Sequence, residues 1–238
     1  MPDMDVMAIG AHPDDIEIGC GGTLIKLAQR GHSIVLVDMS RGEMATRGTI
    51  ETRRQEAAAA TAILGASARE NLELEDGNIH SSPEARYRIA RVVRKYRPAV
   101  VLLPWYEDRH PDHYHTSQAA YEGLFAAGLV RLETGQAPHR PTRVMYYMGW
   151  YEFDPTFVVD ISEQFEQKMR AIYAYTTQFL PDDQAYQQTR LTSNEYNWHL
   201  TSRAAHWGAQ IGVRYGEAFR IRGTMAVDDP LDVSFATF

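Results

Sequence analysis

Short apolar segments alternate with longer helix-like segments over residues 1–150. The apolar segments predict five strands, at residues 6–11, 33–40, 68–74, 99–105 and 143–150. The intervening segments predict helices at residues 22–30, 51–64, 83–96 and 112–130, the first two closed by Gly31 and Gly65. Strands that are apolar nearly throughout and separated by helices are typical of a parallel sheet with both faces covered.

This alternation favours an α/β fold: a Rossmann-like, doubly wound, mainly parallel sheet with helices on both faces. Beyond residue 150 the pattern is less regular, with a strand at 157–162 and helices at 163–178 and 195–211. Because no change in composition marks a linker, we expect a single domain over 1–238. Its Rossmann-like core would be 1–150, and 151–238 would form a C-terminal α/β cap packed on that core.

Composition narrows the class of protein. The formal net charge of -7 argues against a nucleic-acid-binding surface, which is usually basic. No apolar stretch approaches the roughly 20 residues that span a bilayer, and the first residues lack the pattern of a signal peptide. The single cysteine, Cys20, excludes an internal disulfide framework. We therefore expect a soluble cytoplasmic protein with no nucleic-acid or membrane partner.

Two polar clusters follow predicted strands. His12-Pro13-Asp14-Asp15 ends the first strand, and His110-Pro111-Asp112-His113 follows the fourth. In an open α/β sheet, ligands bind in the crevice beyond the carboxyl ends of the strands. Both clusters are therefore predicted to face one crevice, and their imidazoles and carboxylates suit zinc or a similar divalent metal.

Three of these residues are candidate metal ligands. His12 and Asp15 lie three apart in a turn, and His113 would add a third ligand from the helix after the fourth strand. Two histidines and one carboxylate with an open position match a hydrolytic zinc site, in which the pKa of bound water falls to about 7. The same ligands accept Zn²⁺, Fe²⁺ or another divalent metal.

The other polar residues of the clusters are candidates for acid–base chemistry. Asp14 would take a proton from water as general base, and His110 would stabilise a developing oxyanion or protonate a leaving group. Asp112 would orient a histidine. A single His-Pro-Asp turn is often only a helix cap, but two such clusters at strand ends favour catalysis.

The glycine-rich segment 19–22 is a weak nucleotide-binding signal, because its spacing is not GxGxxG and polar residues separate it from the strand. This argues against an NAD-dependent enzyme. We expect these glycines to let the backbone pass close under the metal site and to start the following helix. Cys20 is either a thiolate ligand or a small buried apolar residue, and the second interpretation is favoured.

Three motifs resemble one known family. The segment AHPDDIEIGCGG, the downstream TRRQEA and the HPDH cluster are similar to the zinc-dependent N-acetylglucosaminyl deacetylases of the PIG-L/LmbE type. Residues 208–219, GAQIGVRYGEAF, look like the branch that makes bacillithiol, whose members remove acetate from N-acetylglucosaminyl-malate. The resemblance spans nearly the whole chain.

The resemblance assigns the same ligands, base and acid as the residues themselves suggest. It also implies two substrate-binding residues. Arg53 would contact sugar hydroxyls or an anionic aglycone, although it could instead be a helix surface residue paired with Glu51 or Glu56. Tyr196 would lie over the site, or would only pack its helix.

The function implied is hydrolysis of the N-acetyl group of a small N-acetylglucosaminyl conjugate, here the malate conjugate of bacillithiol biosynthesis. The alternatives are another N-acetyl sugar, such as a chitobiose-like or inositol conjugate, and a sugar-binding protein without activity. The resemblance also implies a homo-oligomer, with a hexamer as the common state of the branch. The aromatic segment 145–153 could form core or such an interface.

Overall fold

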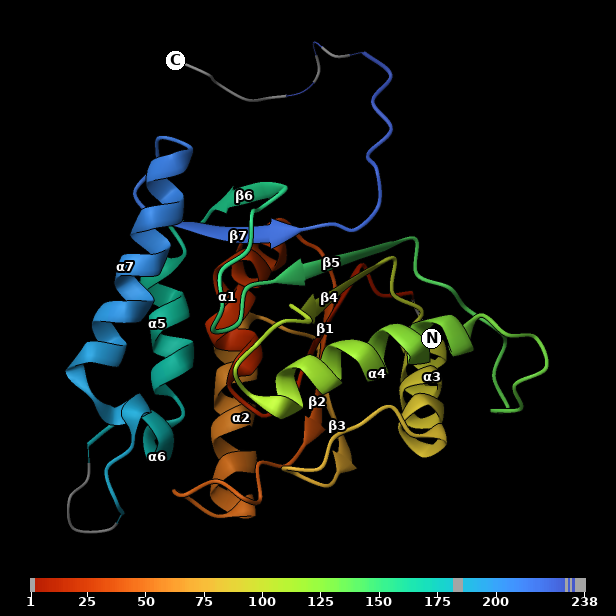
Figure 1. Cartoon of the computed structure of the whole chain (residues 1–238), viewed down its shortest axis with the longest axis horizontal. Helices are drawn as coiled ribbons and strands as arrows, with labels where there is room; N and C mark the ends of the chain where they lie inside the picture. Colours follow the sequence, from red (N-terminus) through yellow and green to blue (C-terminus); the bar gives the residue numbers. More distant parts are fainter. Residues whose placement is uncertain (1–2, 182–185, 230, 232, 234–238) are drawn as a thin grey trace.

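The strands form one mixed sheet in the order β3-β2-β1-β4-β5-β7-β6 (Figure 1). The computed structural model describes residues 3–181, 186–229, 231 and 233. The strands are β1 (Val6–Gly10), β2 (Ile34–Ser40), β3 (Ala68–Leu74), β4 (Val100–Pro104), β5 (Arg143–Tyr147), β6 (Phe157–Asp160) and β7 (Gly216–Arg220). Strands β1 to β5 pair in parallel, and the order reverses between β1 and β4. The predicted Rossmann-like α/β fold is confirmed.

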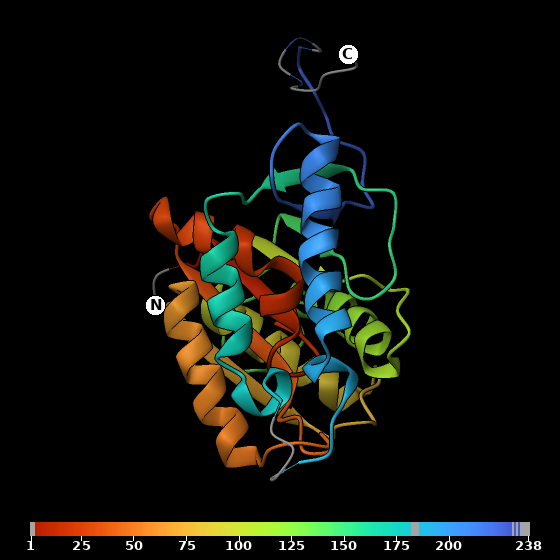
Figure 2. The same cartoon turned by 90° about the vertical axis from the view of Figure 1, so that its left-hand side faces the viewer.

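Helices cover both faces of this sheet. They are α1 (Asp15–Gln29), α2 (Ile50–Leu64), α3 (Pro83–Tyr96), α4 (Pro111–Ala127), α5 (Phe165–Tyr173), α6 (Thr176–Phe179), the short 3₁₀ helix η1 (Arg190–Thr192) and α7 (Asn194–Gln210). Helices α3 and α4 pack together, and α1, α2 and α5 form the other layer, with α7 beside α5 (Figure 2). No helix in the described ranges is long and apolar enough to cross a membrane.

The alternation of side chains along β1 explains the two layers. Met7 and Ile9 pack in the apolar cluster that includes residues of α3 and α4, and Ala8 packs in the cluster that includes residues of α1. All three side chains are fully buried. A strand buried on both faces needs apolar residues at every position, which is the continuous run seen in the sequence.

Helix α1 begins at Asp15, and the prediction that it begins at Gly22 is wrong. Gly19 and Gly22 lie inside the helix, where they allow close packing. A Cβ on Gly19 would lie 2.3 Å from the Tyr147 ring. At Cys20 the helix departs from helical dihedral angles, with φ at -144°. Cys20 is fully buried in the apolar cluster under the sheet, as the favoured interpretation predicted.

The C-terminal part extends the sheet as well as covering it. Strand β7, which the sequence analysis did not predict, pairs antiparallel with β5 and with β6. The helix predicted at 163–178 is broken into α5 and α6 around Ala174 and Tyr175. The division of the domain at residue 150 stays a prediction.

A buried ion network joins α1, β2 and β3 behind the start of α1. The guanidinium of Arg69 donates from Nε and Nη2 to the carboxylate of Asp38, at 2.7 Å each, and from Nη1 to Glu17 at 2.6 Å. The hydroxyl of Tyr175 donates to the same Glu17 oxygen at 3.1 Å. Glu17 is fully buried. One permanent cation therefore pairs with two carboxylates that the fold has removed from water.

Replacing Arg69 by methionine should destabilise the protein by about 3–5 kcal/mol, because Asp38 and Glu17 would remain buried without a cation. Urea unfolding of the purified variant measures this loss. The matched control is Arg54→Met, since Arg54 pairs with Glu51 on the exposed face of α2 and its removal should change little. Equal stabilities of the two variants would show that the network is not required.

Candidate active site

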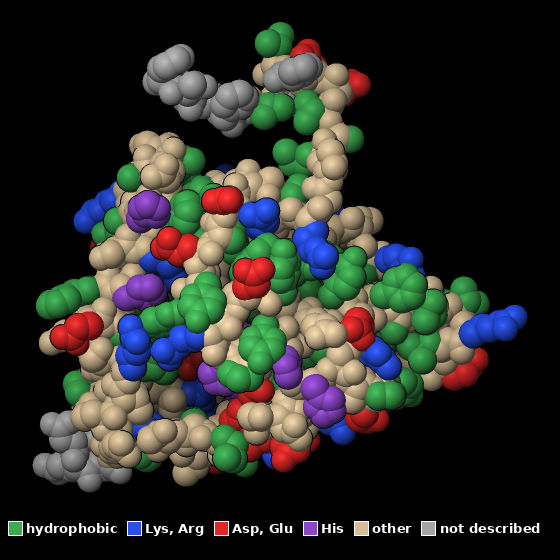
Figure 3. Space-filling view, in the orientation of Figure 1, with side chains coloured by type: hydrophobic (Ala, Val, Ile, Leu, Met, Phe, Trp, Pro, Cys, Tyr) green, Lys and Arg blue, Asp and Glu red, His purple; other side chains and the backbone are tan. Residues whose placement is uncertain are grey.

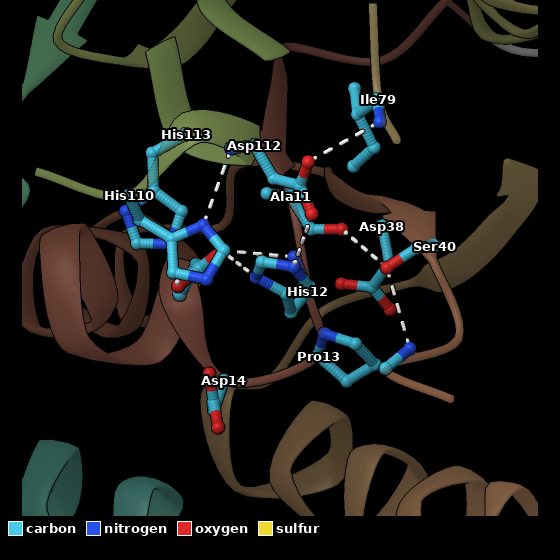
Figure 4. A network of polar contacts seen from close by, with 12 residues as sticks. Ala11, His12, Pro13, Asp14, Asp38, Ser40, Ile79, His110, Asp112 and His113 are labelled. Atoms are coloured by element: carbon cyan, nitrogen blue, oxygen red, sulfur yellow. Dashed lines mark hydrogen bonds and ion pairs between the residues drawn. The ribbon is translucent and has the colours of Figure 1, made fainter. Parts of the chain in front are cut away.

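The two polar clusters meet at the point where the strand order reverses. Strands β1 and β4 are parallel neighbours, with Val6 opposite Val100, so both carboxyl ends lie at one edge of the sheet. The first cluster leads into α1, and the second leads into α4 (Figure 4). A cavity of about 490 Å³ opens there, and its lining includes His12, Asp14, Asp15, Arg53, Asp76, Asp108, His110, His113 and Tyr196.

The turn after β1 sends two adjacent carboxylates in different directions. Asp14 has a left-handed backbone, with φ at 117°, at the residue just before α1. A non-glycine residue in that region costs on the order of 1–3 kcal/mol, so the surrounding contacts must hold it. The side chain of Asp14 makes no cap hydrogen bond to the helix. In Figure 4, Asp14 is set apart from the three histidine rings.

His12, Asp15 and His113 present one ligand atom each within 4.8 Å of one another. Asp15 lies between the two rings: its Oδ2 is 3.4 Å from Nδ1 of His12, and its Oδ1 is 3.2 Å from Nε2 of His113. The three side chains are 13%, 13% and 20% exposed. The structure therefore brings together the three predicted ligands in a partly enclosed position.

Three further aspartates contact the rings of His12 and His113, as is usual for histidines that bind a metal. Nε2 of His12 lies 3.1 Å from Asp76 and 3.2 Å from Asp112, and Nδ1 of His113 lies 3.2 Å from Asp108. Histidines that bind metals usually donate their second N–H to such a group, which fixes the tautomer and the ring orientation. In the neutral rings, the nitrogens that face Asp15 would thereby carry no hydrogen and could bind an ion. The donor set fits a divalent metal.

A second group of possible ligand atoms, from His12, His110 and Asp112, also lies within 4.8 Å. Both oxygens of Asp112 are already used, because the backbone N–H groups of Gly77 and Ile79 donate to them at 2.8 and 3.2 Å. Nδ1 of His110 accepts the backbone N–H of Asp112 at 3.2 Å. This group therefore supports the site, and we infer that the first group holds the ion.

His110 is arranged as a neutral hydrogen-bond donor. Since its Nδ1 accepts a backbone N–H, the hydrogen of the neutral ring is on Nε2. Burial, together with the nearby charges of His113 and His12, lowers the pKa of His110. Its ring stacks on that of His113 at 4.7 Å between centroids.

Arg53 binds Asp14 directly. Its Nη1 lies 3.3 Å from Oδ2 of Asp14, and its Nη2 donates to the backbone oxygen of Pro13. Arg53 is 3% exposed, so the alternative of a surface residue paired with a glutamate is wrong. Burial raises the pKa of Asp14 to about 7, although the charge of Arg53 opposes the shift.

Tyr196 is a buried residue in the first turn of α7, and it lines the cavity. Its ring is nearly parallel to that of Trp150, with an interplanar angle of 12° and centroids 6.1 Å apart. It also packs against Phe179 of α6. Tyr196 therefore packs against its neighbours and also lines the cavity.

The aromatic segment 145–153 is divided between the core and the cavity. Tyr146, Tyr147 and Phe153 are buried, and Trp150 lines the cavity. Tyr151 is 51% exposed. The interface predicted for this segment is untested, and Tyr151 is its clearest exposed aromatic residue.

The sequence analysis did not identify Asp76 and Asp108. A signal for Asp108 exists, since it lies two residues before His110 in the same loop. Asp76 follows β3 in the same way that His12 follows β1. Trp150 and three arginines, Arg109, Arg190 and Arg203, also line the cavity and were missed.

Comparison with known proteins identifies relatives of this chain. The profile of the PIG-L family, described as GlcNAc-PI de-N-acetylase, matches residues 7–124. The diacetylchitobiose deacetylase of Thermococcus kodakarensis is 33% identical over 231 residues, covering 90% of this chain and 82% of the relative. A probable N-acetyl-alpha-D-glucosaminyl L-malate deacetylase of Bacillus anthracis is 28% identical, covering 73% and 81%. The solved structure of a conserved protein from Thermus thermophilus superposes with a TM-score of 0.86 at 36% identity, covering 94% and 97%.

Without a metal, both ligand histidines hold protons tightly. Burial alone would lower the pKa of His113, but the charge of Asp15 and hydrogen bonds with Asp108 and Asp15 raise it to about 9. The pKa of His12 is raised well above its ordinary value, against the effect of burial, by its hydrogen bonds with the surrounding aspartates. A proton must leave each ring before that ring can bind a metal.

Zn²⁺ binding at pH 7 should therefore release about two protons. Its apparent affinity should rise as the pH rises toward 9, because the protonated form of each histidine is populated below its raised pKa and competes with the metal. Titration calorimetry in buffers of different ionisation enthalpy measures the number of protons. An affinity that does not change between pH 6 and pH 8 would contradict this expectation.

Replacing Asp108 by asparagine should weaken metal binding roughly 10–100-fold, because His113 loses the carboxylate that orients its ring. Competition with a chromogenic chelator measures the affinity. Glu107→Gln is the matched control, since it removes the same charge from an exposed neighbouring side chain. If both variants bind Zn²⁺ as tightly as the wild type, Asp108 does not support the ligand.

Proposed function

The chain belongs to the PIG-L (GlcNAc-PI de-N-acetylase) family, and from this premise we propose that it is a metal-dependent N-deacetylase. Its substrate is a small N-acetylglucosaminyl conjugate, and its products are the free amine and acetate. The observation that carries the proposal is the convergence of His12, Asp15 and His113 beside a buried Asp14 held by Arg53. The intact set argues against a protein that only binds a sugar.

We assign the metal to His12, Asp15 and His113, with Zn²⁺ as the metal favoured by these ligands and Fe²⁺ as the alternative. When bound, such a metal supplies a Lewis acid for the amide carbonyl and lowers the pKa of a water molecule to about 7. Asp76, Asp108 and Asp112 hold the two histidines in the tautomers that leave a nitrogen free.

Asp14 is the proposed general base. A carboxylate with a pKa of about 7 in the metal-free protein is suited to exchange protons at neutral pH. The bonds from Arg53 to Asp14 and to the backbone of Pro13 fix the position of the carboxylate. Asp14 takes one proton from the attacking water and returns it to the amine nitrogen as the C–N bond breaks. The hydroxyl of the water stays on the acyl carbon as acetic acid, which ionises to acetate and leaves the second proton to the amine.

His110 is the proposed donor to the acyl oxygen. Its neutral ring carries a hydrogen on Nε2, and that N–H can donate to the oxygen as negative charge develops there. Asp112 takes part in two ways, since its backbone N–H fixes the His110 ring and its carboxylate accepts from His12. A side-chain substitution at Asp112 would therefore remove the contact with His12 and leave the backbone N–H that binds His110.

Arg53 and Tyr196 are proposed to contact the sugar. The side chain of Arg53 lines the cavity, and its buried Nε has no hydrogen-bond partner among the described residues. The relatives are named for a diacetylchitobiose and for a malate conjugate, so both aglycones, and an inositol conjugate, are candidates. A homo-oligomer and a cytoplasmic location stay predictions.

Replacing Asp14 by asparagine should lower deacetylation of the preferred N-acetylglucosaminyl conjugate by roughly 10²–10⁴-fold, because the amide cannot accept the proton of water. Metal content should not change, since Asp14 is not among the proposed ligands. Released acetate and elemental analysis measure the two quantities. His113→Ala is the contrasting variant, and it should lose the metal itself. Wild-type turnover by the Asp14→Asn protein would show that Asp14 is not the general base.

A further inference from the structure

Two arginines from separate elements lie over one indole ring in the cavity, and a third binds the backbone beside that ring. The guanidinium of Arg109, in the loop before α4, lies 4.3 Å from the centroid of the Trp150 ring. That of Arg190, at the start of η1, lies 4.2 Å from the same centroid. Arg203 of α7 donates to the backbone oxygen of Gly149, next to Trp150. We call Arg109, Arg190 and Arg203, with Trp150, the arginine cluster.

None of these arginines forms an ion pair within the part of the chain that the structure describes. The side chain of Arg203 donates only to backbone oxygens, those of Gly149 and Ile18. The side chains of Arg109 and Arg190 are exposed, and both lie against the ring of Trp150. Unpaired cations at a cavity wall are notable in a chain with a net charge of -7.

The positive charge of the cluster acts on its neighbours. The ring of His199 stacks on Trp150 at 4.9 Å. Burial, then the charges of Arg203 and Arg190, lower the pKa of His199, and the nearby Glu152 opposes this shift without reversing it. At His199 the positive charges of the cluster therefore outweigh the charge of Glu152, whereas Arg203 itself is also subject to the charges of Glu217, Glu152 and Asp108.

Figure 3 shows Lys and Arg side chains beside histidine side chains on the face where α7 approaches the start of α4. The lining of the cavity contains two chemical groups. His12, Asp15 and His113 form the metal-ligating group, and the arginine cluster forms the other. Asp108 links them, because it contacts His113 and accepts the backbone N–H of Trp150.

We propose that the arginine cluster is an anion subsite that binds a carboxylate or phosphate group on the aglycone of the substrate. This inference rests on the proposed deacetylase function and selects a substrate class within it. A guanidinium offers planar, paired donors that match carboxylate and phosphate oxygens. Arg109 and Arg190 lie over the ring of Trp150, and no hydrogen bond joins their side-chain N–H groups to another described residue, so these donors remain for a ligand.

Arg53 is not the residue that we expect to bind this anion. It is the fourth guanidinium in the cavity lining, but two of its nitrogens are used by Asp14 and by the backbone of Pro13. A substrate anion placed there would lie beside the carboxylate of Asp14 and would compete for the same cation. Among the described residues no carboxylate forms an ion pair with the arginine cluster. The acidic groups near it are Asp108, which accepts the backbone N–H of Trp150, and Glu152.

The test compares three substrates of the zinc-loaded protein: N,N'-diacetylchitobiose, which is neutral, N-acetylglucosaminyl-malate, which carries carboxylates, and N-acetylglucosamine 1-phosphate. Released acetate gives kcat/KM for each. We expect the wild type to favour at least one anionic substrate over the neutral one by roughly tenfold or more, the worth of one charge-assisted hydrogen bond. The two anionic arms distinguish a carboxylate from a phosphate.

Arg109→Gln, Arg190→Gln and the double variant should lower the ratio of anionic to neutral kcat/KM, by roughly tenfold for each single change. Arg190→Lys should retain part of the ratio, because it keeps the charge and loses the paired donors. The matched control is Arg222→Gln, which removes an exposed arginine stacked on Tyr106 and Tyr121 away from the cavity. It should leave the ratio at the wild-type value.

A binding measurement separates the failure of the subsite from the failure of the function. Calorimetry compares glucosaminyl-malate with glucosamine on metal-free wild type and on the double variant. Equal kcat/KM for neutral and anionic substrates, unchanged in the variants, would overturn the anion subsite and leave the deacetylase standing. If no substrate is hydrolysed, the proposed function fails. Binding of glucosaminyl-malate that the double variant loses would then still support the subsite, and equal binding would overturn it.

Discussion

The parallel pairing of β1 with β4 is the constraint on which the rest of the molecule depends. These two strands lie side by side although about a hundred residues separate them in the chain, and the strand order reverses between them. The helices that follow them leave toward opposite faces of the sheet, so the space beyond the strand ends stays open. His12 and His113 come within reach of one carboxylate, Asp15, for this reason alone.

Buried carboxylates are paired with cations in two places, once in the core and once in the candidate site. Asp38 and Glu17 are paired with Arg69, whose charge is permanent. Asp15 is instead neutralised by histidines, and in the metal-free protein protons on His12 and His113 supply the positive charge. A proton on an imidazole can be exchanged for a metal, and the charge on a guanidinium cannot. Arg69 is therefore a fixed cation in the core, whereas His12 and His113 carry exchangeable protons in the candidate active site.

The fold and the metal-ligating part of the site can be predicted from local sequence patterns. Continuous apolar runs predict the parallel strands, and clusters directly after those runs place His12, Asp15 and His113 at one edge. The start of α1 was mispredicted because glycine is a poor helix former, whereas Gly19 is required here by the Tyr147 ring.

The arginine cluster and Asp76 were missed for a different reason. Arg109, Trp150, Arg190 and Arg203 come from four segments, and only the packing of the C-terminal helices against the core brings them together. No spacing in the sequence encodes that contact. Strand β7 was missed because its residues, GEAFR, lack a long apolar run, and it is held by pairing with β5 and β6.

The charges along the cavity determine how a substrate can lie in it. Its volume of about 490 Å³ is within the range of sites for small molecules. An anionic group is disfavoured near Asp14, Asp15 and Asp76, and it is favoured beside Arg109 and Arg190. A conjugate with an acetamide at one end and an oxyanion at the other would therefore bind in one direction, with its acetamide toward His12 and His113. Electrostatics would orient the substrate before any hydrogen bond to the sugar does.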